Sequence, residues 1–342
     1  MRDVSGMQQP AVGGSSATGL SIGGDAASAV GRRRRLLRLG GAGGVVSGIA
    51  IDHRDSMRLM LERQGGEDPG IDTLRSLKLA LTRALAPTAT VIMLDEELGG
   101  LALEVGAVPP SVALIMPLEA QGYETAAAGR VTTLLDDFSP GIALRYGADA
   151  CKLLLPYRID EPEAAALQEA LVTSTAGACH AVGLPLVVEP VAYKRPDETI
   201  DAFGGAYSGL VVGSIERLRP LGVDLLKLPF PILELAATGD AAALDACRAV
   251  NRACRDTPWV LLGAGADTEL FVEQIRLAGT AGASGFLAGR GIWGAAVAAY
   301  RDESEVARTA ATVCLPALGR CREAAERFAQ PIGRPPHPLS GE

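Results

Sequence analysis

Short apolar runs alternate with helical stretches along most of the chain. Eight runs rich in β-branched residues and leucine end in a polar residue or glycine, and each later run precedes an Ala-, Leu- and Arg-rich stretch. The predicted strands are residues 45–52, 90–95, 111–117, 150–154, 185–189, 224–229, 259–263 and 285–289. The predicted helices are residues 71–85, 161–182, 209–218, 241–254 and 268–279, with one or two more within 304–327. This alternation predicts an α/β protein with a single (β/α)8 TIM barrel.

The two ends of the chain differ in character from this central region. The first 30 residues are rich in Gly, Ser and Ala and cannot bury enough apolar area to offset their ordering entropy. We therefore predict a disordered extension over 1–35, the barrel with its C-terminal helices over 36–328, and a Pro-rich tail over 329–342. The arginines at 32–35 fit a targeting or nucleic-acid-binding arm, but we favour a solvated first helix turn leading into the domain.

Composition narrows the class of protein further. The 342 residues are 48% hydrophobic and 21% charged, which is typical of a soluble globular protein. The formal charge of −8 argues against broad nucleic-acid binding. No apolar run approaches the ~20 residues of a membrane helix, so we expect no membrane insertion. The six cysteines show no CxxC spacing, which favours reduced thiols in a cytoplasmic protein. Assembly into a homo-oligomer stays open.

Candidate site residues gather where the predicted strands end. In a (β/α)8 barrel the chemistry lies at the carboxyl ends of the strands, so polar residues and glycines there are the first to consider. They are Asp52, His53, Arg54, Asp95, Glu119, Lys152, Glu189, Lys227, Gly263, Gly265, Gly289 and Arg290.

Lysine is rare in this chain, with only four among the 32 basic residues. Lys78 and Lys194 lie in a mixed helix and a loop, where we expect them to be solvated. Lys152 and Lys227 each interrupt a run that should be buried on both faces of a parallel sheet. A buried ammonium is costly unless it faces the barrel mouth beside a carboxylate or a substrate. Desolvation and a neighbouring cation both lower a lysine pKa, which frees an amine to form a Schiff base.

Two lysines at the active end of one barrel therefore favour Schiff-base chemistry. The alternative is that both are structural, paired with acidic residues drawn from Asp149, Glu189 and Asp224. Glu189 lies among apolar neighbours on the strand before Lys227, which suits an acid/base that moves protons at a substrate hydroxyl. A structural ion pair with either lysine is the alternative for Glu189.

The chain offers no histidine cluster for a metal. Its three histidines, at 53, 180 and 337, have no ligand spacing, so we predict neither a metal site nor a cofactor.

The last two strands predict a phosphate site. Residues 262–265 and 288–291 are Gly-rich turns that lead into helices near Thr268 and Trp293. Helix amino termini after strands seven and eight are the usual phosphate site of such barrels, and Arg290 can add a bidentate contact.

These residues resemble the class I tagatose 1,6-bisphosphate aldolases and their sulfofructosephosphate aldolase relatives, within the deoxyribose-phosphate-aldolase-like barrels. The resemblance covers about residues 36–300. The stretches that carry it, in family order and spacing, are residues 49–54 (IAIDHR), 93–99 (MLDEELG), 122–123 (GY), 147–155 (GADACKLLL), 185–189 (PLVVE), 222–227 (GVDLLK) and 289–293 (GRGIW).

The resemblance implies a role for each candidate. Lys227 looks like the Schiff-base lysine, Glu189 like the proton-transfer carboxylate and Lys152 like the neighbouring cation. Arg290 with the loop at 263–265 is similar to the family's phosphate site. His53 stands where the family commonly has glutamine, and Asp55 where a small residue is frequent, so substrate identity and stereochemistry stay open.

The leading hypothesis is thus a metal-independent lyase that cleaves a ketose phosphate into dihydroxyacetone phosphate and an aldehyde. One alternative is an aldolase for another phosphorylated keto sugar or keto acid, such as an intermediate of inositol breakdown. Another is a non-catalytic regulator that binds a sugar phosphate. The intact set of Lys227, Lys152 and Glu189 disfavours the regulator, because binding alone needs no imine.

Overall fold

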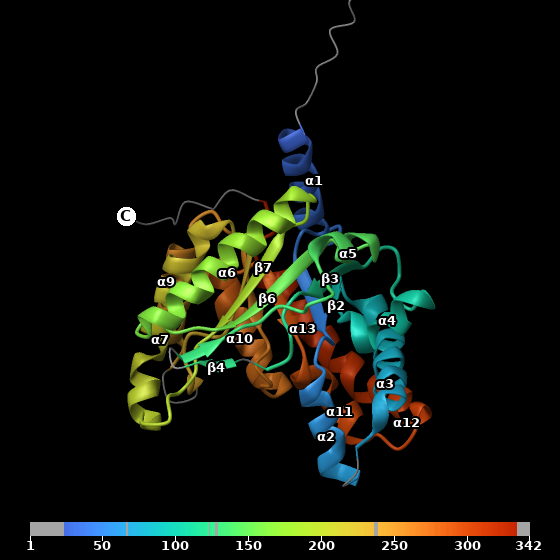
Figure 1. Ribbon diagram of the computed structural model, residues 1–342. Coiled ribbons are helices and arrows are strands. Elements are labelled where there is room, and N and C mark those ends of the chain that lie inside the picture. The colour runs from blue at the N-terminus through green and yellow to red at the C-terminus, as the bar shows by residue number, and fades with distance from the viewer. Residues whose placement is uncertain (1–23, 66–67, 123, 127–128, 236–238, 334–342) are drawn as a thin grey trace, which may run out of the picture.

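Eight parallel strands close into a barrel, seen in the computed structural model (Figure 1). The structure describes residues 24–65, 68–122, 124–126, 129–235 and 239–333. The order around the barrel is β1-β10-β9-β8-β7-β6-β3-β2, so the predicted TIM barrel is confirmed. The strands are β1 (Val46–Ala50), β2 (Val91–Met93), β3 (Ala113–Pro117), β6 (Ala150–Pro156), β7 (Leu186–Val191), β8 (Leu225–Leu228), β9 (Trp259–Leu262) and β10 (Gly285–Ala288).

Helices surround the barrel and include each of the five predicted from the sequence. They are α1 (Gly24–Arg38), α2 (Asp55–Gly65), α3 (Gly70–Leu85), α4 (Glu96–Glu104), α5 (Pro140–Arg145), α6 (Pro162–Ala181), α7 (Ile200–Leu218), α9 (Asp240–Cys254), α10 (Thr268–Ala281), α11 (Arg290–Ala298), α12 (Glu303–Thr309) and α13 (Leu315–Phe328). A π-helical turn over Ala310–Cys314 joins α12 to α13, and a small antiparallel pair, β4 (Glu124–Ala126) and β5 (Gly129–Val131), follows β3. Helices α2, α4 and α5 and the β4–β5 pair were not predicted.

The alternation of side chains along each strand positions the site. Ala150, Val187 and Leu225 belong to the apolar core inside the barrel, and the opposite face of each strand packs against the helices. Because side chains alternate with a period of two, Lys152, Glu189 and Lys227 point to the same inner face, one step nearer the carboxyl ends. These three polar residues therefore lie next to the apolar core inside the barrel, on the side of the carboxyl ends of the strands.

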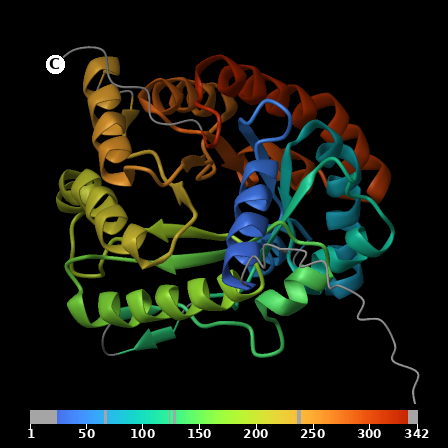
Figure 2. The ribbon, with the colours of Figure 1, turned by 90° about the horizontal axis from the view of Figure 1, so that it is seen from above.

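Helix α1 corrects the predicted boundary of the domain. It lies across the end of the barrel where the strands begin (Figure 2). Arg38 pairs with Asp149 at 2.8 Å and Arg32 with Asp224 at 3.2 Å. The prediction of disorder is therefore wrong for residues 24–35, and residues 1–23 lie outside the described part. The beginning of the predicted tail is also packed, because Ile332 N donates to Gly44 O at 2.8 Å.

Two further features bear on earlier expectations. All six cysteines are free and buried. Within the described residues, no helix is long and apolar enough to cross a membrane.

Candidate active site

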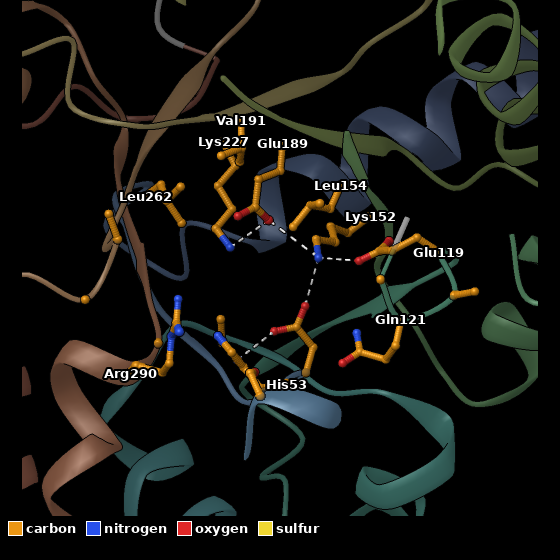
Figure 3. A pocket seen from close by; sticks show the side chains of 18 residues that line it. His53, Glu119, Gln121, Lys152, Leu154, Glu189, Val191, Lys227, Leu262 and Arg290 are labelled. Atoms are coloured by element: carbon orange, nitrogen blue, oxygen red, sulfur yellow. Dashed lines mark hydrogen bonds and ion pairs between the residues drawn. The ribbon is translucent and has the colours of Figure 1, made fainter. Parts of the chain in front are cut away.

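A cavity of about 440 Å³ opens at the carboxyl ends of the strands (Figure 3). Its polar lining comes from the ends of β1, β3, β6, β7, β8 and β10 and from the first turn of α2. These residues are Asp52, His53, Ser56, Glu119, Gln121, Lys152, Glu189, Lys227 and Arg290. The cavity thus unites most of the residues selected from the sequence.

Lys152 lies at the centre of the charged cluster. Its Nζ is 3.0 Å from Asp52 Oδ2 and 3.5 Å from Glu189 Oε2, and it also donates to Glu119 Oε1. Burial opposes the ammonium charge, but these three carboxylates outweigh it and raise the pKa of Lys152 well above its usual range. Lys152 is therefore a fixed cation.

Lys227 contacts a single carboxylate, which it shares with Lys152. Its Nζ donates to Glu189 Oε2 at 2.9 Å. Strand β7 lies between β6 and β8, so Glu189 stands between the two lysines. Each of the three side chains is about 95% buried, yet all three border the cavity. Of the acidic partners considered from the sequence, Glu189 contacts both lysines, whereas Asp149 pairs with Arg38 and Asp224 with Arg32.

Glu119 and Asp52 have opposite electrostatic environments. Burial raises the pKa of Glu119 despite the nearby Lys152. Its Oε2 is buried without a hydrogen-bond partner. Burial also acts on Asp52, but Lys152, His53 and Lys227 outweigh it and hold its pKa well below the usual range. Asp52 is therefore a permanent anion, while Glu119 keeps one buried oxygen without a hydrogen-bond partner.

His53 lies on the floor beside Arg290. Its Nδ1 is 3.5 Å from Asp52 Oδ1, and its ring meets Trp293 edge-on with centroids 5.1 Å apart. Burial lowers the pKa of His53 to about 4, overcoming the attraction of Asp52. Gly289 allows this packing, because a Cβ there would lie 2.9 Å from His53 Cε1. The imidazole is thus neutral near pH 7.

The two helix starts that the sequence predicts as a phosphate site differ in their capping. Arg290 is the first residue of α11, borders the cavity and makes no ion pair or hydrogen bond with a described residue. The N-cap, Gly289, provides no side-chain cap. Helix α10 differs, because Asp267 already caps it by accepting from Leu270 N at 3.0 Å. The loop before α10 still brings Gly265 to the cavity wall in a left-handed conformation, φ +81°.

Three of the selected residues do not line the cavity. Asp95 caps α4 by accepting from Leu98 N at 2.7 Å and pairs with Lys78, which is fully buried. The expectation that Lys78 is solvated is therefore wrong. Arg54 is buried and donates from Nη2 to Glu119 O at 2.7 Å. Gly263 donates its N–H to Leu287 O at 3.2 Å, within the barrel wall.

Gln121 was missed from the sequence, although it lines the cavity. Its Oε1 accepts from Arg54 N at 3.2 Å and Asp55 N at 2.9 Å, at the start of α2. The one available signal was its position two residues after Glu119, in a loop without periodicity. As for metal ligands, no group of three or more His, Cys, Asp or Glu placed to hold an ion occurs among the described residues.

The fold and the site define a (β/α)8 barrel with a buried centre of two lysines and a shared carboxylate, of the kind that reacts with carbonyl substrates. The chain belongs to the DeoC/LacD family of aldolases, whose family model matches residues 46–295. The protein is accordingly an aldolase, a type of lyase.

Individual relatives agree with this assignment. The chain is 29% identical over 293 residues to tagatose 1,6-diphosphate aldolase 2 of Streptococcus mutans, which covers 80% of this chain and 87% of that protein. It is 30% identical over 280 residues to tagatose 1,6-diphosphate aldolase 1 of Streptococcus pyogenes, with coverage of 77% and 85%.

The fold also matches a solved structure. This is the fructose-bisphosphate aldolase of Plasmodium falciparum in complex with TRAP and a small-molecule inhibitor, with a TM-score of 0.67 and 16% identity. The match covers 89% of this chain and 96% of that one, and at this identity it supports the fold alone.

Proposed function

We propose that the protein is a class I aldolase that cleaves a phosphorylated ketose through a Schiff base on Lys227, without a metal ion. The products are dihydroxyacetone phosphate and an aldehyde. The observation that carries this proposal is the contact of Lys227 Nζ with Glu189 Oε2 at 2.9 Å inside the cavity, beside Lys152. The free buried thiols fit the cytoplasmic location predicted from the sequence.

The chemistry follows from these neighbours. The neutral amine of Lys227 adds to the ketose carbonyl, and loss of water leaves an iminium. Glu189 takes the proton of the substrate C4 hydroxyl, the C3–C4 bond breaks, and its electron pair moves toward the iminium nitrogen to form an enamine. The aldehyde leaves, C3 is protonated, and water releases dihydroxyacetone phosphate from Lys227. Lys152 keeps Glu189 and Asp52 in place throughout, through contacts at 3.5 and 3.0 Å.

The substrate phosphate binds at the start of α11. Arg290 is unpaired there, and a helix amino terminus attracts anions through its N–H groups and its dipole. This places the phosphate on the side of the cavity opposite Gln121 (Figure 3).

Trapping of the intermediate tests this proposal. Borohydride reduction with dihydroxyacetone phosphate should add one substrate-derived mass to the intact protein, and peptide mapping should locate it on Lys227, because only an imine has a reducible C=N bond. Lys152→Met serves as the matched lysine control and should still be labelled. A label on Lys152 in the unmodified enzyme would reverse the two roles, and no label at all would refute the mechanism.

Metal independence needs a separate measurement. We expect cleavage to survive prolonged incubation with EDTA. Loss of activity that Zn²⁺ or Mg²⁺ restores would contradict the class I assignment.

A further inference from the structure

We infer that the substrate carries only one phosphate, on the dihydroxyacetone half, so that the aldehyde leaves without a charge. This inference rests on the proposed function and narrows its substrate class to ketose 1-phosphates. It sets this chain apart from the tagatose 1,6-diphosphate aldolases that it resembles, whose names specify two phosphates.

Only one cation on the described cavity wall is available for an anion. The cationic side chains there are Lys152, Lys227 and Arg290. Lys152 is bound by three carboxylates, and Lys227 contacts Glu189 and must stay free for the carbonyl. Arg290 alone is unpaired, and it lies at the amino terminus of α11. The internal residues that the structure leaves undescribed, 66–67, 123, 127–128 and 236–238, include no lysine or arginine.

No other nearby basic group supplies a second cation to the described cavity wall. Arg54 is 4% exposed and is not part of the cavity wall. Its Nη2 donates to the backbone oxygen of Glu119, and its Nε is buried without a partner. Arg58, on the next turn of α2, pairs with Asp68. His53 borders the cavity but is neutral near pH 7, because burial lowers its pKa to about 4. A phosphate dianion away from Arg290 would therefore find no partner charge from these groups on the described cavity wall.

The wall opposite Arg290 is built for neutral oxygens. Gln121 Oε1 accepts from Arg54 N and Asp55 N, so the side-chain oxygen faces α2 and the NH2 group is left for the cavity (Figure 3). The second contact occupies the amide of Asp55, the first residue of α2, which would otherwise attract an anion. Asp55 begins that helix and places a further negative charge at its start.

Glu119 supplies the complementary group on this wall. Glu119 borders the cavity, and its Oε2 is buried without a hydrogen-bond partner. A carboxyl oxygen and an amide NH2 side by side match a hydroxyl, which both donates and accepts. The same carboxyl oxygen repels a phosphate. The distal wall thus fits the hydroxyl groups of an uncharged aldehyde.

The charge balance of the cavity supports this conclusion. Even when Lys227 is positive, as in the iminium, Asp52, Glu119 and Glu189 balance Lys152, Lys227 and Arg290, so one dianion at Arg290 already makes the site negative. A second dianion would lose its hydration without gaining a counter-charge, which is strongly unfavourable in a partly buried site. A sulfonate at the distal end would meet the same wall, with one negative charge.

The test compares matched substrates on the full-length enzyme. Cleavage of the 1-phosphates, 6-phosphates and 1,6-bisphosphates of fructose and tagatose would be followed by release of dihydroxyacetone phosphate or of unphosphorylated dihydroxyacetone. For the better of the two sugars, we expect kcat/KM for the 1-phosphate to exceed that for the bisphosphate at least about tenfold, the effect of one unfavourable charge contact. A bisphosphate cleaved as well or better, or a preferred 6-phosphate, would overturn the inference.

Trapping with dihydroxyacetone phosphate separates this inference from the proposed function. If the borohydride adduct forms on Lys227 but the bisphosphate is preferred, the Schiff-base mechanism stands and only the single-phosphate inference fails. If no adduct forms, the proposed function itself fails.

A charge added to the distal wall provides a second test. Ser56 lies in the first turn of α2 and borders the cavity. Ser56→Lys should raise the bisphosphate-to-monophosphate ratio of kcat/KM by about tenfold, because it supplies the missing cation. Ser56→Met has similar length without charge and should leave that ratio unchanged. Equal ratios in Ser56→Lys and Ser56→Met, with circular dichroism showing both folded, would contradict the argument from charge.

Discussion

Two places in this molecule bury lysines against carboxylates, and they differ in what surrounds the pair. Lys78 of α3 meets Asp95, at the start of α4, where the two side chains are 0% and 1% exposed. Lys152 and Lys227 are almost as buried, at 3% each, but both border the cavity at the barrel mouth. Burial alone therefore does not distinguish a lysine in a closed ion pair from a lysine beside a cavity.

The difference lies in the number of carboxylates and in access to a ligand. Burial lowers the pKa of Lys78, because the single Asp95 does not fully compensate. Three carboxylates raise the pKa of Lys152. Asp95 uses its remaining oxygen to cap α4, whereas Glu119 leaves an oxygen unused at the cavity. A site with unused polar groups beside a cavity points to a ligand, and a closed pair points to structure.

Replacing Lys227 should separate the two regions most strongly. Lys227→Met removes the nucleophile, and we expect kcat to fall by about 10⁴-fold or more while the protein stays folded. Steady-state cleavage and circular dichroism would be measured together. Residual activity within tenfold of the unmodified enzyme would assign Lys227 to structure, as for Lys78.

The shared carboxylate should have the next largest effect. Glu189→Gln keeps the shape but cannot accept the hydroxyl proton, so cleavage should slow by roughly 10²- to 10⁴-fold. Borohydride trapping on Lys227 should survive at a reduced level, because imine formation precedes this proton transfer. Unchanged cleavage would leave Glu189 only its ion pairs with Lys152 and Lys227.

Replacing a member of the Lys78–Asp95 pair should change the stability of the protein and not its catalysis. Lys78→Met leaves Asp95 buried without its cation and should lower the free energy of unfolding by about 3–5 kcal/mol in urea titrations. The double variant Lys78→Met/Asp95→Asn should recover much of this loss, since asparagine can still cap α4. A large fall in kcat of folded Lys78→Met would contradict the structural role.

Lowering the pH should destabilise the folded protein through His53, which lines the cavity. Its folded pKa of about 4 lies below the ordinary value of 6.5, so the unfolded chain binds more protons between these values. This contribution to stability is present above pH 6.5 and declines as the pH falls toward 4, by about 3 kcal/mol across the window. His53→Gln lacks it, so the stability difference between the two proteins should change between pH 7 and pH 4.5. If the unfolding free energies of the two proteins change in parallel with pH, the lowered pKa of His53 would be refuted.

Replacing Arg290 should have the smallest effect of these substitutions. Arg290→Ala should raise KM for a phosphorylated substrate by an amount equivalent to about 2 kcal/mol. Arg290→Lys should restore part of the loss, because an ammonium supplies the charge without the planar fork. Equal losses with an unphosphorylated ketose would move the phosphate site elsewhere.

The sequence predicted the barrel and its lysines because both depend on local pattern. Lys152 and Lys227 each interrupt an apolar run that should be buried on both faces of a parallel sheet, so both could be expected at the barrel mouth. Asp95 was misplaced because a strand end does not show where the chain turns next. The acidic residues that follow it, Glu96 and Glu97, are a helix-start signal, and in the structure Asp95 is that N-cap.

Contacts between distant segments were not accessible from local pattern. Arg38 meets Asp149 and Arg32 meets Asp224 across more than 100 residues, so composition alone suggested disorder where α1 forms. Gln121 depends in the same way on the backbone of Arg54 and Asp55, which only the closed barrel brings near.

The position of α1 has a practical consequence for attaching this enzyme to other molecules. Its docked arginines hold the helix on the face where the strands begin, and the start of α1 lies farther from the barrel than its end (Figure 1). A solid support or fusion partner joined ahead of Gly24 would therefore leave the cavity facing the surrounding solution. Immobilisation through this end should preserve substrate entry, whereas a linker inserted near Gln121 would obstruct it.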